Sequence, residues 1–105
     1  MPQAFKLEFY VPETHVETVK QALFAAGGGR WGNYAECCWQ AAGTGQFRPL
    51  PGSDPFVGSA GALEQVTEIK VDMLVDAAAL PAVIAALRAS HPYETPAFYY
   101  WEVHL

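Results

Sequence analysis

The chain has 105 residues, of which 51% are hydrophobic and 16% charged, with a formal charge of −5 and a pI near 5.0. This length predicts a single domain, residues 1–105, with enough apolar material for a core. The six Lys and Arg side chains are scattered, so no basic patch is available to neutralise the phosphates of nucleic acid or to bind an anionic membrane.

The sequence also bears on the cellular location. The N-terminus lacks a charged-then-apolar signal pattern, and no apolar run approaches the roughly 20 residues that span a membrane. The two cysteines, Cys37 and Cys38, are adjacent. A disulfide between them would be strained, because neighbouring residues on a strand point to opposite faces. We therefore expect a reduced, cytoplasmic protein.

The first quarter of the chain predicts a strand and a helix. Apolar and polar residues alternate over residues 5–11, which is typical of a half-buried strand, and Pro12 ends it. Thr14 and Glu17 fit a capping box at the start of a helix. Helical spacing of apolar residues continues over residues 16–24, and three glycines at 27–29 stop the helix.

The middle of the chain predicts two strands around a glycine-rich stretch. Residues 34–40 favour a second strand, with Ala35, Cys37 and Trp39 on one face. Residues 43–61 contain five glycines and three prolines, which indicate a long loop or an irregular hairpin tip. Residues 63–75 predict a long third strand, with Thr67, Ile69, Val71, Met73 and Val75 on one face.

The last third predicts a helix and a final strand. Apolar residues recur at helical spacing over residues 80–87, with Pro81 suited to the first turn. After the sequence HPYETP, residues 97–105 alternate as a fourth strand. The order β-α-β-β-α-β predicts an α+β protein of the ferredoxin-like class, in which two helices cover one face of an antiparallel sheet.

The strand patterns predict which side chains face the helices. Odd-numbered residues of strands one, three and four are expected to point to the helices, and even-numbered residues to form an open face. That open face would carry Lys6, Glu8, Glu68, Lys70, Asp72, Phe98, Tyr100, Glu102 and His104. Exposed aromatics mixed with paired charges are suited to assembly with another chain.

The HPYETP segment (residues 91–96) is the strongest candidate site. His91 and Glu94 are suitable ligands for zinc, nickel or copper. Further ligands would have to come from elsewhere, and Glu64, Glu68 and Cys37 are the candidates by fold. In the alternative interpretation the prolines make a rigid corner, with Tyr93 packed and His91 capping the last carbonyls of the second helix.

Four stretches resemble the YqfO-type family. They are residues 29–37 (GRWGNYAEC), 43–49 (GTGQFRP), 61–68 (GALEQVTE) and 91–97 (HPYETPA). In larger members the module is an insert in a dimetal-binding protein often labelled a GTP cyclohydrolase homologue, and the insert is similar to the trimeric CutA and PII signalling proteins. The resemblance implies a stand-alone CutA/PII-like domain that forms a dimer or trimer. It implies no reaction for these 105 residues, because the flanking dimetal domain that the larger members contain is not among them.

The glycine-rich stretch is a second candidate site. Gly43, Gly45 and Arg48 could bind an anion through backbone N–H groups and a guanidinium. The stretch matches neither GxxxxGK[ST] nor GxGxxG, so the glycines fit hairpin bends equally well. The likeness to PII proteins implies that the loop between strands two and three can contact ligands and partners.

These observations favour a homo-oligomeric sensor or adaptor domain that binds a metal ion or small ligand in clefts between subunits. Two alternatives are open. The first is an enzyme in which His91 is the general acid or base and Glu94 orients it. The second is a structural domain whose open sheet face binds another protein.

Overall fold

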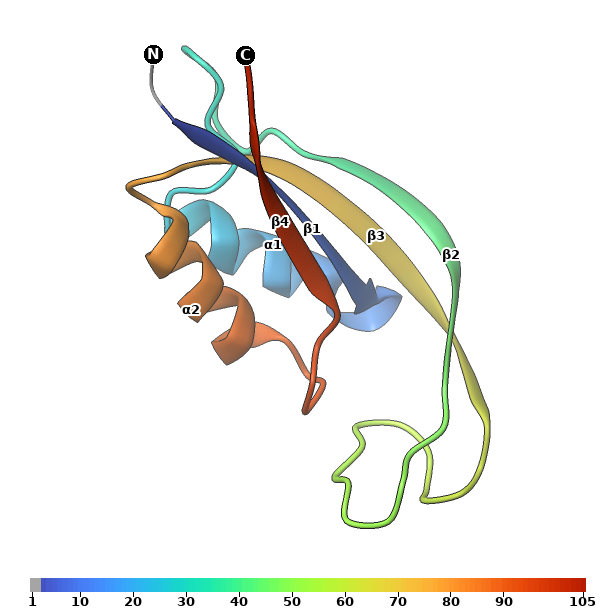
Figure 1. The fold of residues 1–105 in the computed structure, drawn as a ribbon. Helices are drawn as coiled ribbons and strands as arrows, with labels where there is room; N and C mark the ends of the chain where they lie inside the picture. Colours follow the sequence, from blue (N-terminus) through green and yellow to red (C-terminus); the bar gives the residue numbers. More distant parts are fainter. Residues whose placement is uncertain (1–2) are drawn as a thin grey trace.

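A computed structural model describes residues 3–105. In this part of the chain, two α-helices cover one face of a four-stranded antiparallel sheet with the strand order β2-β3-β1-β4 (Figure 1). The elements are β1 (Ala4–Pro12), a 3-10 turn (Glu13–His15), α1 (Val16–Ala25), β2 (Trp39–Phe47), β3 (Glu64–Asp76), α2 (Leu80–Ser90) and β4 (Phe98–Val103). The predicted α+β ferredoxin-like class and element order are confirmed.

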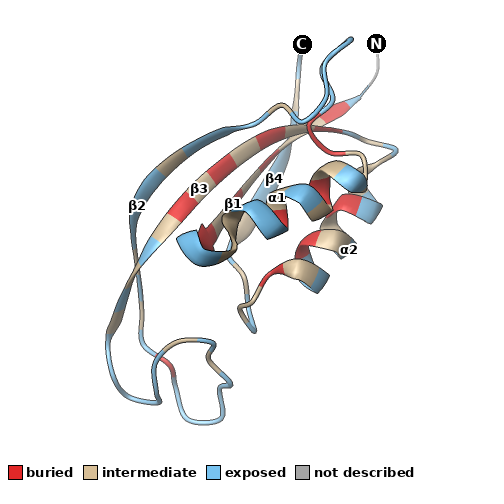
Figure 2. Cartoon of the chain, turned by 180° about the vertical axis from the view of Figure 1, so that it is seen from behind, coloured by how far each residue is buried: buried red, intermediate tan, exposed pale blue. Residues whose placement is uncertain are grey.

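The hydrophobic core lies between the helices and the two central strands. β1 and β3 pair so that Leu7 lies opposite Met73 and Phe9 opposite Val71, which places their apolar side chains on one face. Burial of each such side chain stabilises the fold by about 1.5–3 kcal/mol. Figure 2 shows buried positions alternating with less buried ones along β3, the strand that lies beside the helices. The buried cluster comprises Leu7, Phe9, Val11, Val19, Leu23, Ile69, Val71, Met73, Val75, Val83 and Leu87.

The start of α1 differs from the prediction. Thr14 and Glu17 do not form a capping box, because Thr14 lies inside the 3-10 turn and the N-cap position is His15, which makes no side-chain cap. The end of α1 agrees with the prediction. Gly27 adopts a φ of 109°, a left-handed value that glycine tolerates best, and the chain leaves the helix there.

The second strand begins later than predicted. β2 starts at Trp39, opposite Asp72, and runs to Phe47, opposite Glu64, so the strand predicted at residues 34–40 is wrong over most of its length. Cys37 precedes β2 and its N–H bonds to the Gly29 carbonyl at 2.8 Å, so the predicted strand face of Ala35, Cys37 and Trp39 does not exist. Residues 43–47, which the sequence places in the loop, belong to β2 instead, because their backbone pairs with the edge of β3.

The two faces of the last strand are also the reverse of those predicted. Phe98 lies opposite Phe9 and Tyr100 opposite Leu7, so even-numbered residues of β4 share the helix-covered face. The odd-numbered Trp101 lies opposite Lys6 on the open face. Sequence alternation could not set this phase, because residues 98–101 are all aromatic. The predicted faces of strands one and three are correct.

The β2–β3 hairpin extends beyond the rest of the sheet. β1 pairs with β3 only as far as Pro12, opposite Glu68, whereas β2 follows β3 to Glu64. Figure 1 shows the two strands projecting past the helices and ending in a long loop. This 48–63 loop turns back towards the connection between α2 and β4, where it meets the HPYETP segment. Neither helix within residues 3–105 has the length and apolar character needed to cross a membrane.

Candidate functional site

The HPYETP segment begins where α2 ends. His91 is the C-cap of α2, with extended dihedrals of φ −73° and ψ 134°. This conformation is expected because the ring of Pro92 disfavours helix for the residue before it. The segment then crosses the end of the sheet near Glu68 and leads into β4. Its side chains bond to β1, to β3 and to the 48–63 loop.

His91 is bonded through both ring nitrogens and is only 6% exposed. Nδ1 accepts the Tyr93 N–H at 3.1 Å, so Nε2 carries the proton and donates to the Tyr10 carbonyl at 2.7 Å. Burial lowers the pKa of His91 below its ordinary value of 6.5, against the opposing effect of the bond to Tyr10. The imidazole is thus a neutral bridge between β1 and the HPYETP segment. Within one chain, neither nitrogen can bind a metal or exchange a proton without losing a backbone bond.

Tyr93 connects the segment to the sheet. Its hydroxyl donates to Oε2 of Glu68 at 2.7 Å. Burial, together with this bond to a carboxylate, raises the pKa of the Tyr93 hydroxyl above its ordinary value of 10. The ring of Tyr93 lies 6.2 Å from both Phe47 and Phe56, measured between ring centroids. Tyr93 therefore joins an aromatic cluster whose other members come from the end of β2 and from the 48–63 loop.

A cavity of about 260 Å³ lies between the HPYETP segment and the 48–63 loop, which we call the loop cavity. Its walls include the three clustered aromatic rings and the carboxylates of Glu68 and Glu94. The Asp54 N–H donates to Oε1 of Glu94 at 3.0 Å, which ties the loop to the segment. Phe56 also contacts His15 edge-on, with 5.2 Å between ring centroids, so the loop closes against the start of α1. The complete lining is Gln46, Phe47, Pro49, Ser53, Pro55, Phe56, Val57, Glu68, Tyr93, Glu94, Thr95 and Ala97.

The candidate metal ligands are divided between different places. Glu68 and Glu94 line the loop cavity, whereas Glu64 lies against Gly58 and Cys37 lies near the other end of the sheet. Within residues 3–105, no three His, Cys, Asp or Glu side chains gather closely enough to hold a metal ion. A metal site made from these residues would need side chains from a second copy.

The residues of the candidate anion site are similarly dispersed. Gly43 and Gly45 lie in β2, and a Cβ at Gly45 would collide with the Glu68 carboxylate. Arg48 donates from Nη1 to the Gly61 carbonyl at 2.6 Å and so closes the base of the loop. Gly45 therefore faces an acidic group, and Arg48 has a loop-closing contact.

The open sheet face combines charge pairs with exposed aromatics. Lys70 lies 3.3 Å from Glu8, whose pKa is lowered, first of all by the hydrogen bond from Tyr10. The same bond raises the pKa of Tyr10 to about 12. Trp39 and Trp101, from the two edge strands, are 61% and 43% exposed. This face therefore offers apolar area at both edges and neutralised charge between them.

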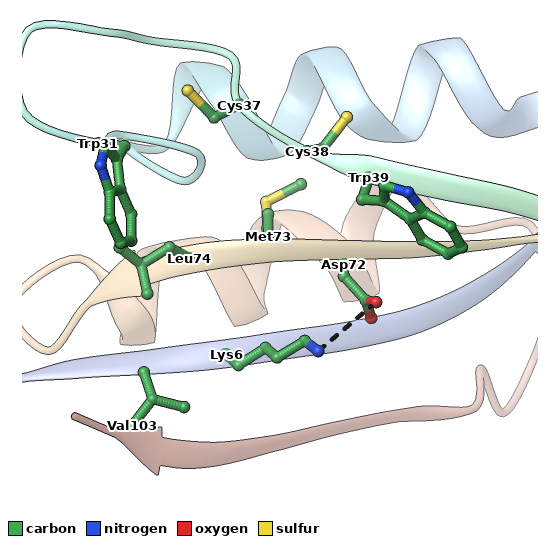
Figure 3. A pocket seen from close by; sticks show the side chains of 9 residues that line it. All are labelled: Lys6, Trp31, Cys37, Cys38, Trp39, Asp72, Met73, Leu74 and Val103. Carbon is green, nitrogen blue, oxygen red and sulfur yellow. Dashed lines mark ion pairs between the residues drawn. The ribbon is translucent and has the colours of Figure 1, made fainter. Parts of the chain in front are cut away.

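A second cavity of about 350 Å³ lies at the opposite end of the sheet (Figure 3). Trp31, Trp39 and the two cysteines line it, and Lys6 forms a 3.8 Å ion pair with Asp72 at its base. Oδ1 of Asp72 is buried without a hydrogen-bond partner. In Figure 3 the sulfur atoms of Cys37 and Cys38 point in different directions, so they do not form a dithiol site.

Phe47 and Phe56 are the site residues that sequence reasoning missed. Phe56 follows Pro55 in a stretch rich in glycine and proline, where a large apolar side chain is unusual unless it packs against something. The sequence alone therefore indicated that Phe56 packs against another part of the protein. It could not indicate that the partner is Tyr93, because the two residues meet only in the folded chain.

The fold defines the general class of protein. Structural likeness extends to CutA from Xylella fastidiosa, with a TM-score of 0.63 and 21% identity over 97% of this chain and 85% of CutA. It also extends to Bacillus subtilis GlnK solved as a complex with ATP, with a TM-score of 0.63 and 14% identity over 96% of this chain and 82% of GlnK. The expected CutA/PII-like fold is confirmed.

Sequence likeness points to a more particular group. The chain is 50% identical over 93 residues to a GTP cyclohydrolase 1 type 2 homolog of Mycobacterium leprae, and 42% identical over 93 residues to that of Bacillus subtilis. Each match covers 89% of this chain, but the chain spans only about a quarter of these relatives, 24% and 25% respectively. No family model matches the chain.

A solved structure agrees with this sequence likeness. The Bacillus cereus protein related to NIF3 has a TM-score of 0.82 and 35% identity, over 97% of this chain and 26% of that protein. The resemblance expected from the four sequence stretches is therefore confirmed for one segment of these larger proteins.

Proposed function

We propose that this chain is a sensor or adaptor module, acting in the cytoplasm, that binds a small ligand in the loop cavity and associates with copies of itself. The observation that carries the proposal is the loop cavity. Ligand sites are typically concave and mostly apolar, with a few convergent polar groups. The loop cavity has that character, with three aromatic rings and two carboxylates on its walls.

The construction of the cavity suits a sensor. One wall is the HPYETP segment, which His91 fixes to β1, and the other is the 48–63 loop. The loop closes on the segment through the Asp54–Glu94 bond and the ring of Phe56. A ligand between the walls would stabilise this closed loop, because it would contact both sides at once. The loop lies at the end of the projecting hairpin, where a neighbouring molecule can contact it.

The module has its own buried core and a complete sheet, which supports folding and action as a stand-alone unit. Self-association is supported by the open sheet face with its exposed tryptophans and by the free edges of β2 and β4. We expect a dimer or trimer. Sedimentation or light scattering at micromolar concentration tests this, and a monomeric mass would overturn the assembly part.

A transition metal bound between copies is a second proposal. The supporting observation is that two candidate ligands, Glu68 and Glu94, already line one cavity. Zinc, nickel and copper titrations by calorimetry test it. Tight binding that is lost in Glu94→Gln would support the metal role, and an absence of binding by the assembled protein would overturn it.

The ligand-binding proposal is tested by a fragment screen with amide NMR spectra of the ¹⁵N-labelled protein. We expect fragments that saturably shift the amides of residues 53–57 and 93–97. The matched control region is the second cavity around Trp31 and Cys38, whose amides should not move with the same compounds. A screen in which no fragment shifts the loop-cavity amides saturably would refute the proposal.

A further inference from the structure

The charge and shape of the loop cavity point to a particular ligand class. We propose that it selects a small organic cation, an ammonium or guanidinium compound with an apolar body, over neutral and anionic compounds of the same size. This inference rests on the proposed ligand-binding function and adds the chemistry of the ligand to it.

The aromatic cluster supplies the apolar part of the site. Phe47, Tyr93 and Phe56 surround the cavity, with centroid distances of 6.2 Å for each pair that includes Tyr93. The two pairs are tilted, with interplanar angles of 54° and 46°, so the rings do not stack face to face. Aromatic faces attract a cation within about 6 Å of the ring centre and also shield its apolar body from water.

The two carboxylates supply the charge. Glu68 and Glu94 both line the cavity, and among residues 3–105 no Lys, Arg or His side chain lines it. Each carboxylate is engaged by one donor, the Tyr93 hydroxyl on Glu68 and the Asp54 N–H on Glu94. A carboxylate has about four acceptor positions, so both can still accept hydrogen bonds from an ammonium or guanidinium group.

The same arrangement rejects anions such as phosphate. The cationic side chains nearest in sequence have other partners, since Arg48 bonds to the Gly61 carbonyl and Lys70 pairs with Glu8. An anion in the cavity would face two negative charges without a compensating positive one. Repulsion between these charges at short range would oppose the binding of an anion.

The volume limits the size of the ligand. At about 260 Å³, the cavity lies just below the roughly 300–1,000 Å³ range that drug-sized ligands occupy. A single ring or a short alkyl chain with one cationic head fits this space better than a nucleotide does. Benzylammonium is therefore a suitable probe, with benzyl alcohol and benzoate as neutral and anionic partners of nearly the same shape.

The experiment is an amide NMR titration of the assembled, ¹⁵N-labelled protein with each of the three probes. Benzylammonium should shift the amides of residues 53–57 and 93–97 saturably and bind about tenfold more tightly than benzyl alcohol, while benzoate should not bind. Glu68→Gln and Glu94→Gln should each weaken benzylammonium binding about tenfold. The matched control is Glu64→Gln, since Glu64 is on the same strand as Glu68 but outside the cavity lining, and it should leave binding unchanged.

A salt series on the unmodified protein provides a test that needs no variant. Added salt should weaken binding of benzylammonium more than binding of benzyl alcohol, because only the former depends on charge. If benzyl alcohol binds as tightly as benzylammonium, the cavity is a ligand site but the charge selection is wrong. If all three probes and the fragment screen leave the cavity amides unmoved, the proposed function fails as well.

Discussion

Replacement of His91 by alanine tests the structural role of the HPYETP segment. The substitution removes two hydrogen bonds, one to the Tyr10 carbonyl at 2.7 Å and one from the Tyr93 N–H at 3.1 Å. Each contributes about 1 kcal/mol, and the loss of an almost fully buried ring adds a cavity term. We expect His91→Ala to lower the free energy of unfolding by about 2–4 kcal/mol.

Urea unfolding followed by circular dichroism measures this loss. His104→Ala is the matched control, because His104 is exposed and no hydrogen bond of its side chain is present within residues 3–105, so it should change stability by less than about 0.5 kcal/mol. An unchanged midpoint in His91→Ala would refute the argument that the imidazole bridges β1 and the segment.

The pH dependence provides an independent check on the same residue. Burial lowers the pKa of His91 in the folded state below its ordinary value of 6.5, so the unfolded chain takes up a proton first as the pH falls. The stabilisation from neutral His91 is therefore complete above pH 6.5 and is lost as the pH falls from there towards the lowered pKa. The fall in stability between about pH 7 and pH 5 should be smaller in His91→Ala, and equal slopes in the two proteins would contradict this account.

Three further substitutions have defined outcomes. Gly45→Ala should move the Glu68 carboxylate away from the Tyr93 hydroxyl and so cost about 1 kcal/mol, the contribution of that hydrogen bond. Gly43→Ala, on the same strand with open space, should have little effect, and equal unfolding midpoints in the two variants would contradict this packing. Tyr93→Phe should cost about 1–3 kcal/mol, since it removes a hydrogen bond to a carboxylate, and urea unfolding measures this loss. Leu87→Ala, fully buried beneath the sheet, should cost about 2–5 kcal/mol by urea unfolding, and a loss below 1 kcal/mol would mean that α2 packs elsewhere.

The parts of the fold that were predicted correctly have a strong local signal. Apolar and polar residues alternate over most of β1 and over residues 68–73 of β3, and both helices carry apolar residues at helical spacing. β2 was misplaced because Gly43 and Gly45 have low strand propensity, and β3 pairs with them through the backbone regardless. β4 was given the wrong phase because its aromatic run contains no polar residue to distinguish its two faces.

The candidate site shows a similar division. The HPYETP segment, which the sequence singles out by two prolines and three functional side chains in six residues, forms one wall of the loop cavity. The hydrogen-bond partners of these side chains could not be predicted from the sequence. Glu68 is 25 positions from Tyr93 and Asp54 is 40 positions from Glu94, and the chain brings each pair within hydrogen-bond distance only after folding. The hydrogen bond from His91 to Tyr10 spans 81 positions.

The sequence alone therefore determined the fold class, the element order and the location of the rigid segment, because propensity, periodicity and proline chemistry act over a few neighbouring residues. Only the tertiary structure decided the edge strand, the face of β4 and the role of His91. It also created the loop cavity, whose walls come from β2, β3, the 48–63 loop and the HPYETP segment. These features depend on long-range pairing and burial, which no short stretch of sequence specifies.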